Sequence, residues 1–379
     1  MNPRVDYIIL GAGGAGLSLL MRILDEPALA GKKIMLIDRG PKITNDRTWC
    51  FWENGEGYFE NIIHHRWENL AVKHPKGTVK LSMGGYAYKM LRATDFYKYC
   101  FGRVNQSTQQ VQLVYGNVTG IDAAEGRVTV DGFTYEAEYI FSSVLTKPPL
   151  LNKKQHYLLQ HFRGWWIETE SDSFDPEQAD LMNFNVPQTQ GCTFVYVLPL
   201  SRRQALVEYT IFSEKELEDG QYDEGLKHFL QHELNLTGYR IIDVENGVIP
   251  MTNYRFAGKD QKVIYIGTAG GQTKASTGYT FSNMQKHATR IVQGLMLKNP
   301  QLFTHPAPPR FRLYDSILLR VLREQKLSGA DVFFSIFNKN PASTVFRFLD
   351  NESNLREDWR IMVKVPWRVF TQAALREIL

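Results

Sequence analysis

A glycine-rich turn near the N-terminus, in the stretch 6–38, constrains this sequence more than any other feature. An apolar run leads into Gly11-x-Gly13-x-x-Gly16, after which leucine and isoleucine recur at helical spacing. A second apolar run then ends on Asp38. This order predicts a strand, a tight turn, a helix and a second strand, which together form the βαβ unit that binds a dinucleotide.

Each part of the motif has a physical role in this interpretation. Gly11 permits the tight turn, Gly13 lets the backbone approach a pyrophosphate, and Gly16 lets the helix pack on the strand. The helix N-terminus offers free N–H groups and partial positive charge to the phosphates. We expect Asp38 to accept hydrogen bonds from ribose hydroxyls, although it follows the first glycine at slightly more than the usual ~20 residues.

The alternative is a glycine turn in another kind of βα unit, which the strand before it and the acid after it disfavour. The position of the motif close to the N-terminus suits FAD-binding folds of the glutathione-reductase type. It does not by itself exclude NAD.

The whole chain has an ordinary globular composition. Its 379 residues are 43% hydrophobic and 22% charged, which predicts two domains and a large core. The net charge of +4 gives no case for nucleic acid, although a basic patch could meet an anionic membrane. Cys50, Cys100 and Cys192 lack metal-binding or disulfide spacing, so we expect no metal site and a reducing cytoplasm. We also expect no signal peptide and no membrane-spanning helix.

The chain divides into four segments by pattern. Residues 1–149 continue the first unit into an α/β domain, apart from an aromatic-rich stretch at 39–55 that its Gly, Pro and Asn predict to be a loop. Residues 150–254 alternate with period two, which predicts an inserted antiparallel sheet for substrate, with a surface helix at 217–234. Residues 255–300 contain a second strand, glycine loop and helix, which predict a return to the first domain.

The second glycine loop and the C-terminal region suggest where ligands lie. The loop at 267–278 precedes a helix predicted at 281–296, an arrangement that reaches the ribityl chain and ring of a flavin. Residues 301–379 are helical in pattern and mix aromatic with basic side chains. They fit either a helical cap on the core or an apolar tunnel with a basic rim that faces a membrane surface.

The chain resembles the FAD-dependent lycopene cyclases of bacterial carotenoid synthesis. The resemblance runs through the segments GAGGAGLSL, NDRTWCFW, LPLSRRQALVEYTIFS, GVIPMT and GTAGGQTKASTGYTFSNMQKHA, and continues in FFSIFNKNPASTVFRFLD and VPWRVFTQAAL. It therefore spans nearly the whole length. It implies an α/β flavoprotein with a Rossmann-like FAD-binding domain, an inserted antiparallel substrate sheet and C-terminal helices.

The resemblance also implies an activity and a set of site residues. The expected enzyme is a lycopene β-cyclase, an isomerase of the intramolecular lyase class, which converts lycopene through γ-carotene to β-carotene without net redox change. FAD would act in its reduced form with NAD(P)H as reductant, at a peripheral membrane position in the cytoplasm. The expected cofactor-binding residues are Gly11, Gly13, Gly14, Ala15, Gly16, Asp38, Arg39, Arg47, Gly267, Gly270, Gly271, Thr277 and Gly278.

Two positions depart from related patterns. Flavin hydroxylases carry Gly-Asp in the second loop, whereas this chain has Gly267-Thr268. Many cyclases show two adjacent acids before a threonine, whereas here the sequence is Glu208-Tyr209-Thr210. Only the first acid of that motif is therefore present.

The chemistry of the substrate points to Glu208 as the catalytic acid. Cyclisation needs a proton on C2 of the terminal double bond of a hydrocarbon, followed by attack of the C5=C6 bond on the C1 cation and loss of a proton from C6. A carboxylic acid in an apolar pocket keeps its proton because ionisation there is costly. Glu208 lies in the apolar segment ALVEYTIF, although a solvent-facing strand position is equally compatible with the alternation.

Other functions remain compatible with these motifs. A flavin-dependent monooxygenase or prenyl reductase would use the same fold on an isoprenoid substrate. A flavin- or carotenoid-binding protein without catalysis belongs to a different class. The sequence is compatible with cyclisation at one end or at both, and indicates no oligomeric state.

Overall fold

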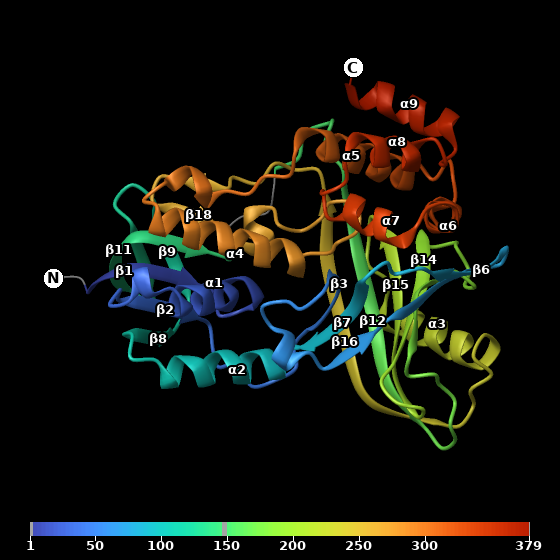
Figure 1. Ribbon diagram of the computed structural model, residues 1–379, viewed down its shortest axis with the longest axis horizontal. Helices are drawn as coiled ribbons and strands as arrows, with labels where there is room; N and C mark the ends of the chain where they lie inside the picture. Colours follow the sequence, from blue (N-terminus) through green and yellow to red (C-terminus); the bar gives the residue numbers. More distant parts are fainter. Residues whose placement is uncertain (1–2, 146–149, 379) are drawn as a thin grey trace.

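The computed structural model describes residues 3–145 and 150–378. Its first sheet carries the N-terminal glycine turn and has the strand order β17-β18-β11-β1-β2-β8, with β10 and β9 extending from β11 (Figure 1). Strands β18, β11, β1, β2 and β8 run parallel. The strands are β1 (Arg4–Leu10), β2 (Ile34–Asp38), β8 (Val111–Tyr115), β9 (Val118–Asp122), β10 (Arg127–Val130), β11 (Phe133–Ser142), β17 (Lys259–Asp260) and β18 (Val263–Tyr265).

Burial on both faces explains why β1 and β2 read as unbroken apolar runs. Tyr7 and Ile9 pack on the face covered by α1 (Gly14–Asp25) and α4 (Phe281–Met296), while Ile8 and Leu10 belong to the core on the other face. The predicted strand-turn-helix-strand order is confirmed, and so is the α/β class of the fold.

The aromatic stretch after Asp38 forms a strand, which corrects the loop predicted from its sequence. Residues 48–54 form β3 (Thr48–Asn54), which pairs along its whole length with β7 (Tyr86–Arg92). The small sheet is completed by β4 (His65–Trp67) on the other side of β7. Glycine and proline near the stretch suggested a loop, but pairing with a partner about forty residues later decides its conformation.

The second large sheet has the order β16-β12-β15-β14-β13-β5-β6. Its strands are β5 (Asn69–His74), β6 (Gly77–Leu81), β12 (Tyr157–Thr169), β13 (Gln178–Asn183), β14 (Cys192–Pro199), β15 (Gln204–Ser213) and β16 (Tyr239–Thr252). The segment 150–254 therefore supplies most of this sheet, mainly in antiparallel pairs. Strands β5 and β6 come from the first segment and join through a parallel pair between β5 and β13.

Helices cover both faces of the second sheet (Figure 1). Helix α3 (Asp219–His232) packs on one face of the sheet. On the other face lie α5 (Pro309–Glu324), α6 (Gly329–Lys339) and α7 (Ala342–Leu349), which share its core of buried aromatic and aliphatic side chains. The other helices are α2 (Ala93–Gln106), α8 (Leu355–Met362) and α9 (Trp367–Ile378). The region expected to be helical at the C-terminal end is thus helical in the structure.

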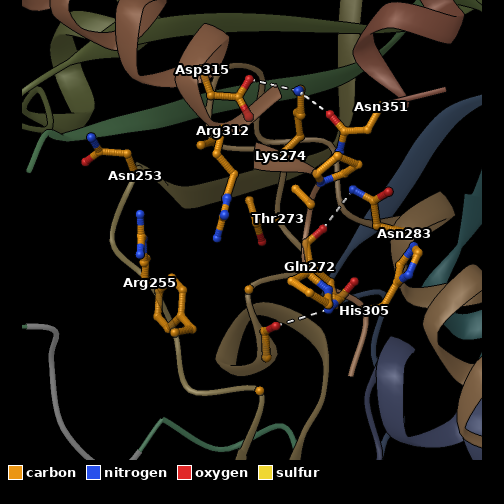
Figure 2. Close-up of a pocket in the computed structure, with 18 of the residues that line it drawn as sticks. Asn253, Arg255, Gln272, Thr273, Lys274, Asn283, His305, Arg312, Asp315 and Asn351 are labelled. Atoms are coloured by element: carbon orange, nitrogen blue, oxygen red, sulfur yellow. Dashed lines mark hydrogen bonds and ion pairs between the residues drawn. The ribbon is translucent and has the colours of Figure 1, made fainter. Parts of the chain in front are cut away.

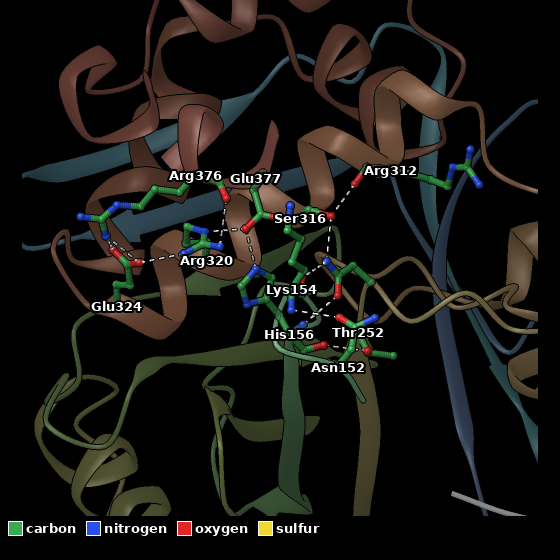
Figure 3. Close-up of polar contacts among 11 residues, drawn as sticks. Asn152, Lys154, His156, Thr252, Arg312, Ser316, Arg320, Glu324, Arg376 and Glu377 are labelled. Carbon is green, nitrogen blue, oxygen red and sulfur yellow. Dashed lines mark hydrogen bonds and ion pairs between the residues drawn. The ribbon is translucent and has the colours of Figure 1, made fainter. Parts of the chain in front are cut away.

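A polar network fixes α9 to the rest of the molecule (Figure 3). Glu377 contacts the ring of buried His156 at 2.7 Å and pairs with Arg320 of α5, while Arg376 pairs with Glu324. The last helix is therefore held against α5 and the start of β12. Within the described part of the chain, no helix is both long and apolar enough to span a bilayer.

Candidate functional site

The first glycine turn has the geometry of a phosphate cradle. Gly11 adopts a left-handed φ of +98°, and a Cβ there would lie 2.1 Å from Ser143 Oγ. A Cβ on Gly16 would lie 2.0 Å from the carbonyl oxygen of Gly11, so the helix packs on the turn only because this residue is glycine. Among the residues that the structure describes, nothing lies within 4 Å of a Cβ built on Gly13, which leaves open space at the N-terminus of α1. No side chain of those residues caps that helix, so its first N–H groups remain available to a ligand.

Asp38 stands beside this turn at the end of β2. Its Oδ2 accepts a hydrogen bond of 2.7 Å from the Ala12 amide, and its Oδ1 lies 3.3 Å from Lys42 Nζ. Asp38 therefore fixes the turn, and its role in binding a ribose stays a prediction. Arg39 and Arg47 are exposed, and their role in cofactor binding stays a prediction.

The second glycine loop adjoins the first in space. It begins with the short turn Gly267–Gly270, and a Cβ on Gly267 would lie 3.0 Å from that of Ala15. Gly267, Gly271 and Gly278 all have positive φ, between 61° and 74°, which fixes them as glycines in this tight path. The two sequence motifs, which are more than 200 residues apart, thus meet at one place.

Unpartnered polar atoms mark the inner side of the second loop. Thr277 Oγ1 and Gln160 Oε1 are buried without a hydrogen-bond partner among the described residues. A Cβ on Gly278 would lie 2.2 Å from Gln160 Oε1, so these groups are close together. Because a buried polar group without a partner is costly, these atoms fit a polar ligand placed against the loop.

Aromatic rings enclose the space next to both loops. A Cβ on Gly14 would lie 3.0 Å from the ring of Trp49, which packs on Phe281 at a centroid distance of 5.5 Å. Phe51 stacks on Phe281 at 4.6 Å, and Trp52 lies 4.2 Å from the ring of Tyr279. The aromatic strand β3 therefore joins the glycine turns to the second sheet.

Glu208 lies in the second sheet opposite a glycine that makes room for a second acid. In the strand register, Glu208 of β15 pairs with Gly164 of β12, and Gly164 pairs on its other side with Glu245 of β16. Residues directly opposite in antiparallel strands share one face, so the two carboxyl groups flank Gly164. A Cβ on Gly164 would lie 3.1 Å from Glu245 Cγ and 3.5 Å from Glu208 Cβ.

The two carboxyl groups hydrogen-bond to each other and to different neighbours. Thr210 Oγ1 donates to Glu208 Oε1 at 3.0 Å. Thr48 Oγ1 donates to Glu245 Oε2 at 2.7 Å, and Trp166 Nε1 donates to the same oxygen at 3.3 Å. Leu206, two residues before Glu208, belongs to the core beneath α5–α7, which places the pair on the face that α3 does not cover.

Burial and mutual repulsion favour protonation of this pair. Burial raises the pKa of Glu208 well above its ordinary value, and the charge of Glu245 raises it further. Burial also raises the pKa of Glu245, although the hydrogen bonds from Thr48 and Trp166 oppose that rise. Since more donors stabilise the charged form of Glu245, Glu208 is the member that retains its proton to higher pH.

Tyr196, which pairs with Glu208 across β14 and β15, belongs to a cluster of tyrosine hydroxyls at the end of the second glycine loop. Tyr279 follows the loop, and its hydroxyl lies 3.2 Å from that of Tyr88 and 3.4 Å from that of Tyr196. Burial raises the pKa of Tyr196, and the charge of Glu208 adds to this rise. Trp52 and Phe346 stack at 4.9 Å beside this group. The arrangement provides a protonated carboxylic acid among aromatic rings, which stabilise positive charge with their faces.

The sequence interpretation and the structure coincide at some residues and not at others. The structure brings Gly11–Gly16 and Gly267–Gly278 together and places Glu208 beside aromatic side chains that adjoin these glycine turns. Sequence reasoning missed Glu245 and Gly164. The segment DVENGVIPM does contain acids in an alternating strand, but only the pairing register places Glu245 opposite Gly164. Within residues 3–145 and 150–378, no cluster of three or more acidic, His or Cys side chains could hold a metal ion.

Comparison with solved structures identifies flavoproteins with the same fold. A geranylgeranyl bacteriochlorophyll reductase-like protein from Thermoplasma acidophilum has a TM-score of 0.64 at 12% identity and covers 98% of this chain and 99% of its own. A flavin-dependent brominase has a TM-score of 0.60 at 11% identity, covering 98% and 93%. A p-nitrophenol 4-monooxygenase from Pseudomonas putida gives 0.59 at 10% identity, covering 99% and 98%.

Comparison with characterised sequences identifies two proteins named lycopene beta-cyclase. The protein from Pantoea ananas is 26% identical over 223 residues. The match covers 55% of this chain and 53% of that relative, so it spans about half of the relative's length. The protein from Pseudescherichia vulneris is 24% identical over 390 positions, which covers 95% of this chain and 94% of the relative. A family model described as lycopene cyclase protein matches residues 6–375. Because that match spans nearly the whole chain, the protein belongs to the lycopene cyclase family.

Proposed function

We propose that this protein is a flavin-dependent lycopene β-cyclase. The observation that carries the proposal is the acid pair Glu208–Glu245. Gly164 leaves room for this pair on an apolar face of the second sheet, and aromatic side chains link that face to the two glycine turns. Membership in the family and the names of the two relatives support lycopene as the substrate, and we expect γ-carotene and then β-carotene as the products.

We infer that the cofactor is FAD, held non-covalently. The open space at Gly13 and the uncapped start of α1 suit its pyrophosphate, and Asp38 suits the adenosine ribose. Thr277 Oγ1 and Gln160 Oε1, which lack hydrogen-bond partners within residues 3–145 and 150–378, suit its flavin end. When bound in its reduced form, the flavin would supply electron density beside a developing carbocation, and NAD(P)H is the reductant we expect.

The residues of this chain account for the acid step. Glu208, kept neutral by burial and by Glu245, gives its proton to C2 of the terminal double bond. The C5=C6 bond then attacks C1, and loss of the proton from C6 restores one double bond, so the product is an isomer of the substrate. The deprotonated acid pair is the base on this sheet face. Trp52 and the tyrosine cluster exclude water from the cation.

The test is the mass of the product. The FAD-loaded protein is reduced with dithionite under anaerobic conditions and incubated with lycopene. The carotenoids are then separated, and their masses are measured by mass spectrometry. A cyclase gives products of unchanged mass with β-ring spectra. Added oxygen indicates a monooxygenase, added hydrogen indicates a prenyl reductase, and unchanged lycopene indicates a binding protein.

We also propose that α8 and α9 contact a membrane surface, because the substrate is insoluble in water. Trp359 and Trp367 are 69% and 65% exposed, and they lie among further exposed apolar residues and basic ones. The exposed apolar residues are Leu355, Val363, Leu375 and Ile378, and the exposed basic residues are Arg356, Arg360 and Arg368. Tryptophan and arginine side by side suit the headgroup region of an anionic bilayer.

A further inference from the structure

A large cavity lies apart from the first glycine turn, between the second glycine loop, α4 and α5 (Figure 2). Its volume is about 1170 Å³. Of the residues expected to bind FAD, only Gly270 and Gly271 line it, and none comes from the first turn. The cavity therefore adjoins the far side of the flavin loop and is separate from the position of the pyrophosphate.

Three of the four acidic side chains of this cavity already have basic partners. Asp315 pairs with Lys274 at 2.8 Å, and Glu352 pairs with Lys286 at 2.6 Å. Glu377 is engaged by His156 and Arg320, as described above. The fourth acid, Asp350, has its pKa raised to about 6 by burial.

Three arginines of the lining remain without a carboxylate partner among the described residues. They are Arg255, Arg290 and Arg312, which come from the loop after β16, from α4 and from α5. Arg290 Nε is buried without any hydrogen-bond partner in that part of the chain. Figure 2 shows the side chains of Arg255 and Arg312 on the same side of the cavity.

Two further features indicate what such a cavity would take. The pKa of His305 is lowered by burial and then by the charges of Arg290 and Lys286, against the smaller opposing effect of Glu352, so positive charge lies close to this ring. Tyr254 and Phe256 also line the cavity, with ring centroids 5.0 Å apart, and provide an aromatic surface beside the arginines. Arginine forks bind phosphate oxygens in pairs, and a cavity of this size accommodates a whole cofactor-sized ligand.

We propose that this cavity is a second anion site that binds a ligand carrying phosphate groups, which the guanidinium groups of Arg255, Arg290 and Arg312 hold. The phosphate belongs either to a soluble nucleotide or to the headgroup of an anionic lipid. The proposal concerns binding alone and does not depend on the cyclase chemistry.

Calorimetric titration of the FAD-loaded protein tests the proposal with three probes: inorganic pyrophosphate, NADPH and vesicles containing phosphatidylglycerol. The double variant Arg290→Gln/Arg312→Gln should weaken pyrophosphate binding at least about tenfold, because each charge-assisted bond is worth roughly that factor. Arg255→Gln alone changes an exposed side chain and should weaken binding without affecting folding. Lys227→Gln on α3 is the control, since it removes one exposed positive charge far from the cavity.

The probes separate the two sources of phosphate. Loss of NADPH binding in the variants, with vesicle binding unchanged, supports a nucleotide. Loss of vesicle binding with no NADPH binding in any protein supports a lipid headgroup. The proposal is overturned if no probe binds the wild-type protein, or if Arg255→Gln and the double variant bind every probe as tightly as Lys227→Gln. Cyclisation by the dithionite-reduced protein is measured separately, so failure of the cyclase assignment leaves this result intact.

Discussion

Replacing either member of the acid pair by glutamine should produce two different kinetic results. Glu208→Gln keeps the shape of the side chain and its hydrogen bond from Thr210 but removes the acidic proton. General acid catalysis contributes typically a factor of about 10² to 10⁴, so the variant should lose at least ~100-fold in the rate of β-ring formation. Its FAD content should stay normal, because Glu208 is not among the residues expected to bind the cofactor.

Glu245→Gln should instead move the pH profile. The active form needs protonated Glu208, so the rate falls as the pH rises through the raised pKa of that group. Glu245 raises this pKa by its charge, in addition to the effect of burial. Its removal should therefore lower the pKa of Glu208 and shift the falling limb of the pH profile to lower pH.

The assay follows β-carotene formation from lycopene by the dithionite-reduced, FAD-loaded protein between about pH 5 and pH 9, with liquid chromatography to quantify the products. Glu168→Gln is the matched control, because this acid lies in the same sheet and is paired with Arg240 instead of with another acid. The reasoning is refuted if Glu208→Gln retains activity within a few-fold of the wild type, or if Glu245→Gln leaves the falling limb where it was.

Three further outcomes follow from the structure. Gly13→Val should abolish FAD release on denaturation, because the side chain fills the open space expected for the pyrophosphate; a normal flavin content would contradict the cofactor site. Trp359→Ser/Trp367→Ser should reduce flotation with phosphatidylglycerol liposomes while thermal stability is unchanged, and equal flotation would exclude α8 and α9 as the contact. The raised pKa of Glu208 means that its contribution to stability is present below its unfolded pKa of about 4.5 and is lost as the pH rises through the folded value. Glu208→Gln should therefore melt higher than the wild type at pH 8 but not at pH 4, as measured by calorimetry.

Local patterns predicted the elements whose residues are close in sequence. The first βαβ unit and the helix at 281–296 are confirmed, because an apolar strand, a glycine turn and helical spacing suffice to determine them. The pattern of residues 91–104 likewise predicts a helix, and the observed helix α2 begins two residues later because Leu91 and Arg92 belong to β7. The proposed boundaries of the four segments remain predictions.

Features that depend on distant pairing could not be predicted from the sequence. The sequence left open whether Glu208 faces solvent or the core, because alternation in β15 allows both orientations. Only the pairing register with Gly164 decides between them. Glu245 was missed for the same reason, since its strand follows the one that carries Gly164 by about eighty residues. Residues 48–54 were predicted to form a loop because of their composition. Pairing with β7 makes them a strand instead, and composition alone does not reveal that pairing.

The parallel pair between β5 and β13 has a consequence for how the chain folds during synthesis. β5 leaves the ribosome about a hundred residues before β13, and until then the edge of β5 that faces away from β6 has no neighbour in the second sheet. β18, which joins β11 in the first sheet, follows β13 after about eighty further residues. Closing such long loops is slow, and exposed strand edges favour aggregation. The chain therefore completes both sheets only late in translation, and chaperones that shield strand edges should raise its soluble yield.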